Sequence, residues 1–160
     1  MKERKIVTNS AKETRELAGK FIGEVLAEAR TAKDGARLIC LWGDLGSGKT
    51  TFTQGLAESL GVKGVVNSPT FLIMKKYLLG GKYAGMNLYH FDCYRIRSAE
   101  EVDDLGWREI LADGNNLVVV EWPEKITEIL PEKRIDMEFE TMAPDARRIT
   151  VKKKDSFCHF

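Results

Sequence analysis

Cysteine is scarce in this sequence, and the few that occur are widely separated. The chain of 160 residues contains 3 cysteines, Cys40, Cys93 and Cys158. They are odd in number, and no two of them have the C-x-x-C spacing of a zinc site or a redox pair. We therefore expect reduced thiols in a cytoplasmic protein.

Long hydrophobic runs and an excess of one charge are also missing. No apolar run approaches the ~20 residues that a membrane helix needs, and the polar segment 1–10 lacks the apolar region of a secretory signal. The 25 basic and 24 acidic side chains give a formal net charge of +1. This balance indicates neither a membrane surface nor DNA as a partner, but it does not exclude an RNA-related role.

Size and composition predict one domain over residues 1–160. The chain is long enough for one domain with a hydrophobic core and too short for two domains of typical size. Its 43% hydrophobic and 31% charged residues are ordinary for a globular protein. We find no internal repeat, low-complexity tract or linker.

Periodicity and capping residues predict helices alternating with strands. Ser10 and Glu13 fit a capping box in which the glutamate reaches back to the Ser10 backbone, and an amphipathic helix follows to about Arg30. The apolar run 36–42 indicates a strand buried on both faces, and a helix after it ends near Gly61. The remaining expected elements are a hairpin around residues 80–81, a helix over 98–111, a strand over 117–120, a short helix to 130, and a strand pair over 134–142 and 147–154. One α/β domain with a mixed sheet accounts for this order.

The stretch between the first apolar strand and the second helix predicts a phosphate site. It matches G-x-x-x-x-G-K-[ST], in which glycines let successive N–H groups point at phosphate oxygens and the helix adds its positive end. Lys49 would place its ammonium against the β- and γ-phosphates, and the Thr50 hydroxyl would face Mg²⁺. A glycine-rich turn with a surface lysine is the competing interpretation, and the strand–loop–helix context argues against it. The predicted nucleotide contacts here are Gly43, Asp44, Leu45, Gly46, Ser47, Gly48, Lys49, Thr50 and Thr51.

Two carboxylates follow β-rich runs, where a neighbouring strand would emerge beside the phosphate loop. Glu121 ends the apolar run 117–120 and is the favoured metal-side ligand, bound directly or through one water. Asp92 could orient or deprotonate an attacking water, or serve the metal shell. Arg95 could neutralise phosphate or pair with Asp92, and His90 is more typical of a core histidine. Thr70, behind Pro69, could reach the γ-phosphate region as switch threonines do.

Taken together, the motifs resemble one known family. GDLGSGKTTF, SPTF, HFDCYR, EEVDDLGWREIL and VEWPEK, with Leu130-Pro131 after them, stand in the order and rough spacing of the bacterial TsaE (formerly YjeE) family. These are ATPases of tRNA threonylcarbamoyladenosine biosynthesis. The likeness runs from about Ser10 to Arg147, and the combination is far more specific than the phosphate loop alone.

The resemblance implies an α/β, P-loop NTPase-like three-layer sandwich with a mixed, partly antiparallel sheet. It implies a cytoplasmic ATPase that uses ATP and Mg²⁺. Its partners would be TsaD and TsaB, whose assembly places threonylcarbamoyl on the adenosine next to the tRNA anticodon, so that tRNA is met indirectly. ATP hydrolysis, slow alone, would reset that assembly. By the family's pattern the catalytic residues are Asp92, Lys49 and Thr70, the metal ligands are Thr50 and Glu121, and the contacts outside the loop are Ser10, Thr14 and Trp122.

Three other functions deserve comparison. A GTPase would explain the D-x-x-G pattern at 103–106, but this pattern follows a helix-cap signal rather than a buried strand, and no N-K-x-D occurs. A small-molecule kinase would share the loop and Mg²⁺, yet residues 99–111 are acidic rather than an arginine-rich lid. An ATP-gated interaction module with little turnover could use a solvent-facing Trp107 or Trp122 for docking, although either tryptophan could instead belong to the core.

Overall fold

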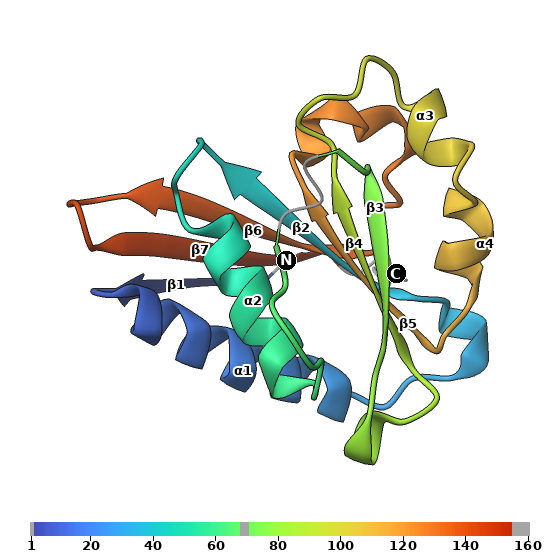
Figure 1. Ribbon diagram of the computed structural model, residues 1–160, viewed down its shortest axis with the longest axis horizontal. Helices are drawn as coiled ribbons and strands as arrows, with labels where there is room; N and C mark the ends of the chain where they lie inside the picture. The colour runs from blue at the N-terminus through green and yellow to red at the C-terminus, as the bar shows by residue number, and fades with distance from the viewer. Residues whose placement is uncertain (1, 68–70, 155–160) are drawn as a thin grey trace.

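The computed structural model describes residues 2–67 and 71–154, and its centre is a seven-stranded sheet in the order β1-β7-β6-β2-β5-β4-β3 (Figure 1). The strands are β1 (Lys2–Thr8), β2 (Arg37–Gly43), β3 (Met74–Leu78), β4 (Asn87–Asp92), β5 (Asn116–Glu121), β6 (Arg134–Thr141) and β7 (Arg147–Lys154). The inner strands β6, β2, β5 and β4 run parallel. The outer strands pair antiparallel, β1 with β7, β7 with β6, and β3 with β4. The predicted mixed, partly antiparallel sheet is confirmed.

Helices lie on both faces of this sheet. α1 (Ala11–Ala27) and α2 (Lys49–Ser59) pack side by side on one face, whereas α3 (Glu100–Asp103) and α4 (Trp107–Ala112) cover the other (Figure 1). Short 3₁₀ turns occur at Ala32–Asp34, Gly81–Tyr83, Pro123–Lys125 and Thr127–Ile129. Within residues 2–67 and 71–154, no helix has the length and apolar character needed to cross a membrane.

The two central strands explain why the core has two halves. Along β2 and β5, alternate side chains point to opposite faces, as the period of a strand requires. Leu41 and Val119 pack under α1 and α2, whereas Cys40 and Val118 pack under α3 and α4. Both faces are therefore apolar, which is the reason the sequence reads as continuous hydrophobic runs at these strands.

β1 was not expected from the sequence. Its residues are mostly charged and exposed, and it lies at the edge of the sheet, where it pairs only with β7. Charged side chains are common on edge strands because they discourage pairing with another chain. The strand thus lacks the apolar alternation by which strands are recognised.

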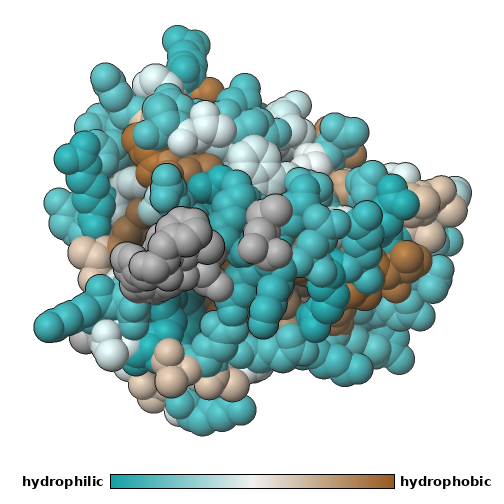
Figure 2. All heavy atoms as spheres, turned by 180° about the vertical axis from the view of Figure 1, so that it is seen from behind, coloured by the Kyte–Doolittle hydropathy of each residue, from teal (hydrophilic) through white to brown (hydrophobic). Residues whose placement is uncertain are grey.

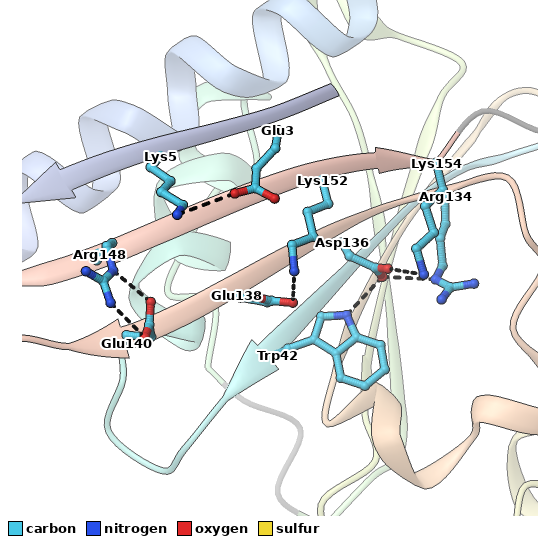
Figure 3. Close-up of polar contacts among 10 residues, drawn as sticks. All are labelled: Glu3, Lys5, Trp42, Arg134, Asp136, Glu138, Glu140, Arg148, Lys152 and Lys154. Atoms are coloured by element: carbon cyan, nitrogen blue, oxygen red, sulfur yellow. Dashed lines mark hydrogen bonds and ion pairs between the residues drawn. The ribbon is translucent and has the colours of Figure 1, made fainter. Parts of the chain in front are cut away.

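The face of β1, β7 and β6 that turns away from α1 and α2 is not covered by any helix of the described residues, and it carries a ladder of ion pairs (Figure 3). Arg148 binds Glu140 through two hydrogen bonds, and Lys152 binds Glu138. Seen from behind, the molecule is mostly hydrophilic, with its hydrophobic residues in small groups (Figure 2). Mixed charge of this kind lets one face of an antiparallel sheet remain in water.

Two helix predictions need correction. The region 98–111 is two short helices, because Gly106 takes a left-handed φ of 87° between them. In α1 the Ser10 side chain does accept a hydrogen bond from the Glu13 N–H, at 3.0 Å. The Glu13 carboxylate, however, accepts from the Asn9 N–H rather than the Ser10 N–H, and the helix ends at Ala27 rather than about Arg30.

Candidate functional site

A cleft of about 550 Å³ opens at the carboxyl ends of the parallel strands. Ligands of open α/β sheets bind at this edge, where the loops after the strands converge. The cleft brings together most of the residues selected from the sequence. Those in its lining are Ser10, Thr14, Leu45, Gly46, Ser47, Gly48, Lys49, Thr50, Thr51, Asp92, Glu121 and Trp122. Gly43 and Asp44 belong to the same loop without lining the cleft, and Thr70 lies outside the described residues.

The loop between β2 and α2 has the backbone that its glycines predict. Gly43, Gly46 and Gly48 all have positive φ, at 146°, 76° and 104°. Gly43 is the last residue of β2, and a Cβ there would lie 2.6 Å from the carbonyl oxygen of its β6 partner Phe139, so only glycine fits at this point. α2 begins at Lys49, and its free N–H groups therefore point into the loop.

The Lys49 side chain is folded back into this loop and is only 5% exposed. Its Nζ donates to the carbonyl oxygen of Asp44 at 3.0 Å and to that of Gly43, and it lies 4.0 Å from the ring centroid of Trp122. Burial lowers the pKa of the Lys49 ammonium, while nearby carboxylates, Glu121 foremost, act in the opposite direction. A partly desolvated ammonium surrounded by oxygen acceptors and an aromatic face is suited to bind an anion.

Trp122 reaches this position through an unusual backbone. Its φ of 60° makes it the one non-glycine residue with a positive φ among those described. A conformation of this kind costs of order 1 kcal/mol and is found most often at functional sites. The indole also packs on the Tyr94 ring, with 4.9 Å between centroids, and so forms a wall of the cleft.

Glu121 is the buried carboxylate at the end of β5, with 2% of its surface exposed. Its Oε1 accepts a hydrogen bond from the Thr50 hydroxyl at 2.9 Å, and its Oε2 lies 2.5 Å from His90 Nε2. The two oxygen ligands expected for Mg²⁺, Thr50 and Glu121, are therefore in direct contact, although they are far apart in sequence.

Asp92 lies beside Glu121 at the same edge, because the two are register partners in the parallel pair β4 and β5. Its Oδ1 accepts a hydrogen bond from the Tyr94 N–H at 3.0 Å, which fixes the carboxylate at the end of the strand. Asp92 and Arg95 both line the cleft. The predicted carboxylate pair is thus adjacent, one member buried by its partners and the other partly exposed.

The start of α1 forms another part of the cleft wall. Ser10 caps this helix, and Thr14 follows one turn later with its hydroxyl 2.8 Å from that of Thr8. Both Ser10 and Thr14, which the family resemblance gave as nucleotide contacts outside the loop, line the cleft. The structure therefore places this segment next to the phosphate loop.

The turn between β6 and β7 also contributes to the site, and the sequence reading missed it. Pro144, Asp145 and Arg147 line the cleft. Arg147 donates to the carbonyl oxygens of Pro144 at 3.1 Å and of Gly46 at 3.2 Å, and so ties the turn to the phosphate loop. The local sequence signal was a Pro-Asp turn before an arginine. This pattern predicts a hairpin, but it does not predict that the hairpin contacts the phosphate loop.

The oxygen atoms in the cleft suit a metal ion that is held jointly by the protein, by phosphate and by water, rather than by protein ligands alone. No group of three or more His, Cys, Asp or Glu side chains in the described ranges is arranged to hold a metal ion. Mg²⁺ typically takes one or two protein oxygens and completes its octahedron with phosphates and water. Thr50 and Glu121 beside the loop fit this pattern, and the buried Ser47 hydroxyl has no hydrogen-bond partner among the residues that the structure describes.

Trp107, considered above as a docking residue, belongs to the core. It is 2% exposed, its Nε1 donates to the Ile129 carbonyl, and its ring meets Phe91 edge-on at 5.1 Å. Cys93 is buried in the same half of the core, and burial raises the pKa of its thiol to about 12. Neither residue faces the cleft.

The family model described as threonylcarbamoyl adenosine biosynthesis protein TsaE matches residues 8–149 of this chain. Three similar proteins carry the name tRNA threonylcarbamoyladenosine biosynthesis protein TsaE. That of Bacillus subtilis is 44% identical over 113 residues, or 71% of this chain and 67% of that protein. Those of Haemophilus influenzae and Treponema pallidum are 38% and 34% identical, over 83% and 91% of this chain and 79% and 97% of their own lengths.

The fold agrees with these matches. The crystal structure of Bacillus subtilis YdiB superposes with a TM-score of 0.71 at 32% identity, covering 96% of this chain and 87% of that one. The α/β fold class is confirmed by this neighbour as well as by the sheet itself. The chain therefore belongs to the TsaE family, whose members are named for a role in tRNA threonylcarbamoyladenosine biosynthesis.

Proposed function

We propose that this protein is a Mg²⁺-dependent ATPase that supports threonylcarbamoyl modification of the adenosine next to the tRNA anticodon. It would bind the TsaD–TsaB transferase assembly and reset it through ATP hydrolysis. The observation that carries the proposal is the convergence of the phosphate loop, the Thr50–Glu121 pair and Asp92 in one cleft. Membership of the TsaE family supports the biological setting.

Binding of the triphosphate would rest on the loop and its helix. Residues 46–50 line the cleft at the positive end of α2, and the N–H groups at the start of this helix would donate to phosphate oxygens. The Lys49 ammonium would exchange the carbonyl oxygens of Gly43 and Asp44 for oxygens of the β- and γ-phosphates. Trp122 and Tyr94 would exclude water from one side of the phosphates.

Thr50 and Glu121 are the residues that would hold Mg²⁺. When bound, the ion neutralises phosphate charge and so favours attack at the γ-phosphorus. The short distance between these oxygens, 2.9 Å, supports their acting on one ion or on one of its waters. Glu121 would otherwise remain a buried carboxylate that only accepts from Thr50 and His90.

Asp92 is the residue that we assign to hydrolysis. Its carboxylate lines the cleft beside Glu121 and is held by the Tyr94 N–H, so it can orient a water and accept its proton. Glu121 is less suited to that task because it is buried against Thr50 and His90, on the side where Mg²⁺ would bind. Thr70 remains a predicted contact near the γ-phosphate, outside the described residues.

ATP turnover by the purified protein, alone and with TsaD–TsaB, tests this function. We expect slow release of phosphate to water that rises when the partner assembly is added. Transfer of the phosphoryl group to an added metabolite would instead support the small-molecule kinase. Tight ATP binding without turnover in either condition would support the ATP-gated interaction module.

A further inference from the structure

His90 is a fully buried polar residue on β4, two positions before Asp92. Its Nε2 lies 2.5 Å from Oε2 of Glu121, whereas its Nδ1 has no hydrogen-bond partner in the described part of the chain. Buried polar atoms are usually paired. An apolar side chain at this position would leave no unpaired nitrogen, so packing alone does not require a histidine here. Among residues 2–67 and 71–154, the contact with Glu121 is therefore the one polar interaction of the imidazole.

With this contact, both oxygens of the Glu121 carboxylate have a partner. The Thr50 hydroxyl donates to Oε1, and His90 faces Oε2. A carboxylate can only accept, so the Nε2 of His90 carries the proton and donates. The three residues come from α2, β4 and β5, and the carboxylate cannot rotate without breaking one of the two hydrogen bonds.

We propose that His90 is a positioning residue that orients Glu121 for the Mg²⁺ of the nucleotide site. This inference rests on the proposed function, because it takes Glu121 as the ligand on the metal side. Mg²⁺ requires nearly ideal octahedral geometry at about 2.1 Å, so a carboxylate that turns freely binds it less well. Hydrogen bonds to metal ligands typically change metal affinity by ~10–100-fold.

Two substitutions separate this role from simple packing. His90→Leu fills the position on β4 with an apolar side chain of similar size and removes the donor to Glu121. His90→Gln also fills the site and carries an amide N–H that can replace Nε2–H. The two variants therefore differ in the hydrogen bond more than in volume.

The test is the affinity for a non-hydrolysable ATP analogue, measured by calorimetry with excess Mg²⁺ and again with EDTA. The ratio of the two dissociation constants reports the metal contribution alone. For His90→Leu we expect the tightening that Mg²⁺ gives to fall by about 10–100-fold, with the EDTA value unchanged. His90→Gln should recover most of the wild-type ratio, which a packing role would not produce.

Several outcomes would overturn the inference. If His90→Leu kept the wild-type ratio, or if His90→Gln behaved like His90→Leu, the hydrogen bond would not position Glu121. If the wild type itself showed no Mg²⁺ effect, the metal part of the proposed function would fail together with this inference. Should His90→Leu not fold by its melting curve, His90→Asn serves in its place, because its shorter amide does not reach Glu121 and the same loss is expected.

Discussion

At Lys49 a cation is held inside the protein by carbonyl oxygens and an aromatic face rather than by a carboxylate. Its Nζ contacts the carbonyls of Gly43 and Asp44 and the ring of Trp122. A carbonyl oxygen carries no net charge, so each of these contacts is weaker for an ammonium than a hydrogen bond to an anionic phosphate oxygen. The Lys49 ammonium would therefore interact more favourably with a bound polyphosphate than with its present partners.

Replacement of Lys49 by alanine should remove nucleotide binding. Hydrogen bonds that involve a charged group contribute ~1.5–3 kcal/mol each, so the loss of contacts to two phosphates should weaken ATP binding by at least about 100-fold. Calorimetric titration of ATP measures this directly. Lys20→Ala, which removes an exposed lysine of α1, is the control and should bind as the wild type does. Equal affinity in Lys49→Ala and wild type would contradict the phosphate site.

For Asp92 the expected effect is on rate and not on binding. Asp92→Asn keeps the shape and the acceptor for the Tyr94 N–H but removes the base, so turnover should fall by ~10²–10⁴-fold. Affinity for ATP with Mg²⁺ should stay within about threefold, because Asp92 is not assigned to the phosphates or the metal. Single-turnover hydrolysis and calorimetry on the same preparation separate the two effects. A variant that hydrolysed ATP normally would show that another group activates the water.

At the scale of elements, the site exists because four parallel strands end at one edge. β2 leads into the phosphate loop, β4 ends with Asp92, and β5 ends with Glu121. These three contributions could be read from the sequence, since each strand is a recognisable apolar or β-rich run that ends in a distinctive residue. β6 leads into the turn that precedes Arg147. The local sequence pattern could not predict the role of this turn, because Arg147 contacts Gly46, which is distant in the sequence.

Other elements were hidden for similar reasons. β1 is defined by pairing with β7 at the other end of the chain, and no local apolar pattern marks it. The approach of His90 to Glu121 depends on the register of β4 against β5, which the sequence does not specify. The sequence pattern predicted that His90 is a core histidine, and its burial agrees with that prediction. The pattern did not predict its contact with Glu121.

Arg147→Ala should loosen the turn between β6 and β7 from the phosphate loop. The guanidinium donates to the carbonyls of Ala143, Pro144 and Gly46, and the loss of these partly exposed hydrogen bonds should cost about 1 kcal/mol of unfolding free energy. We expect faster amide exchange in residues 142–147 and ATP binding weakened by roughly 10-fold, because the loop is less preorganised.

The neighbouring Arg148 offers a matched control. Its ion pair with Glu140 lies on the open face of the sheet, away from the cleft, and exposed pairs of this kind contribute ~0–1 kcal/mol. Arg148→Ala should therefore leave ATP affinity unchanged. If both variants changed ATP binding equally, the effect of Arg147 would be a general one on strand β7.

At the scale of the whole molecule, the sheet separates two kinds of surface. Its carboxyl edge carries the cleft and the groups that would meet phosphate, and the open face of β1, β7 and β6 carries the ion pairs of Figure 3. The net charge of +1 conceals this arrangement, because both surfaces mix acidic and basic residues. Asp136 and Glu140, two acidic residues whose pKa values are lowered by ion pairs, lie outside the lining of the cleft.

The ion pairs predict that the fold loses stability in acid. At Asp136, burial opposes ionisation, but hydrogen bonds from Trp42, Arg134 and Lys154 outweigh it and lower the pKa of the carboxyl. The Thr31 N–H and Lys133 lower the pKa of Asp34 to about 2. Because these pKa values are lower in the folded protein, the unfolded chain takes up protons first as the pH falls. The stabilisation is thus complete well above about pH 4, the unperturbed value for aspartate, and is lost progressively below it.

Urea unfolding at neutral pH and at several values between about pH 4 and pH 2 measures this loss. Asp136→Asn is the informative variant, because it removes the buried carboxylate and leaves Arg134 and Lys154 without their shared partner. It should be less stable than the wild type at neutral pH and should lose less stability on acidification. Glu16→Gln, which affects an exposed carboxylate of α1, should retain the wild-type pH dependence. A wild-type slope in Asp136→Asn would show that acid acts on this fold through other carboxylates.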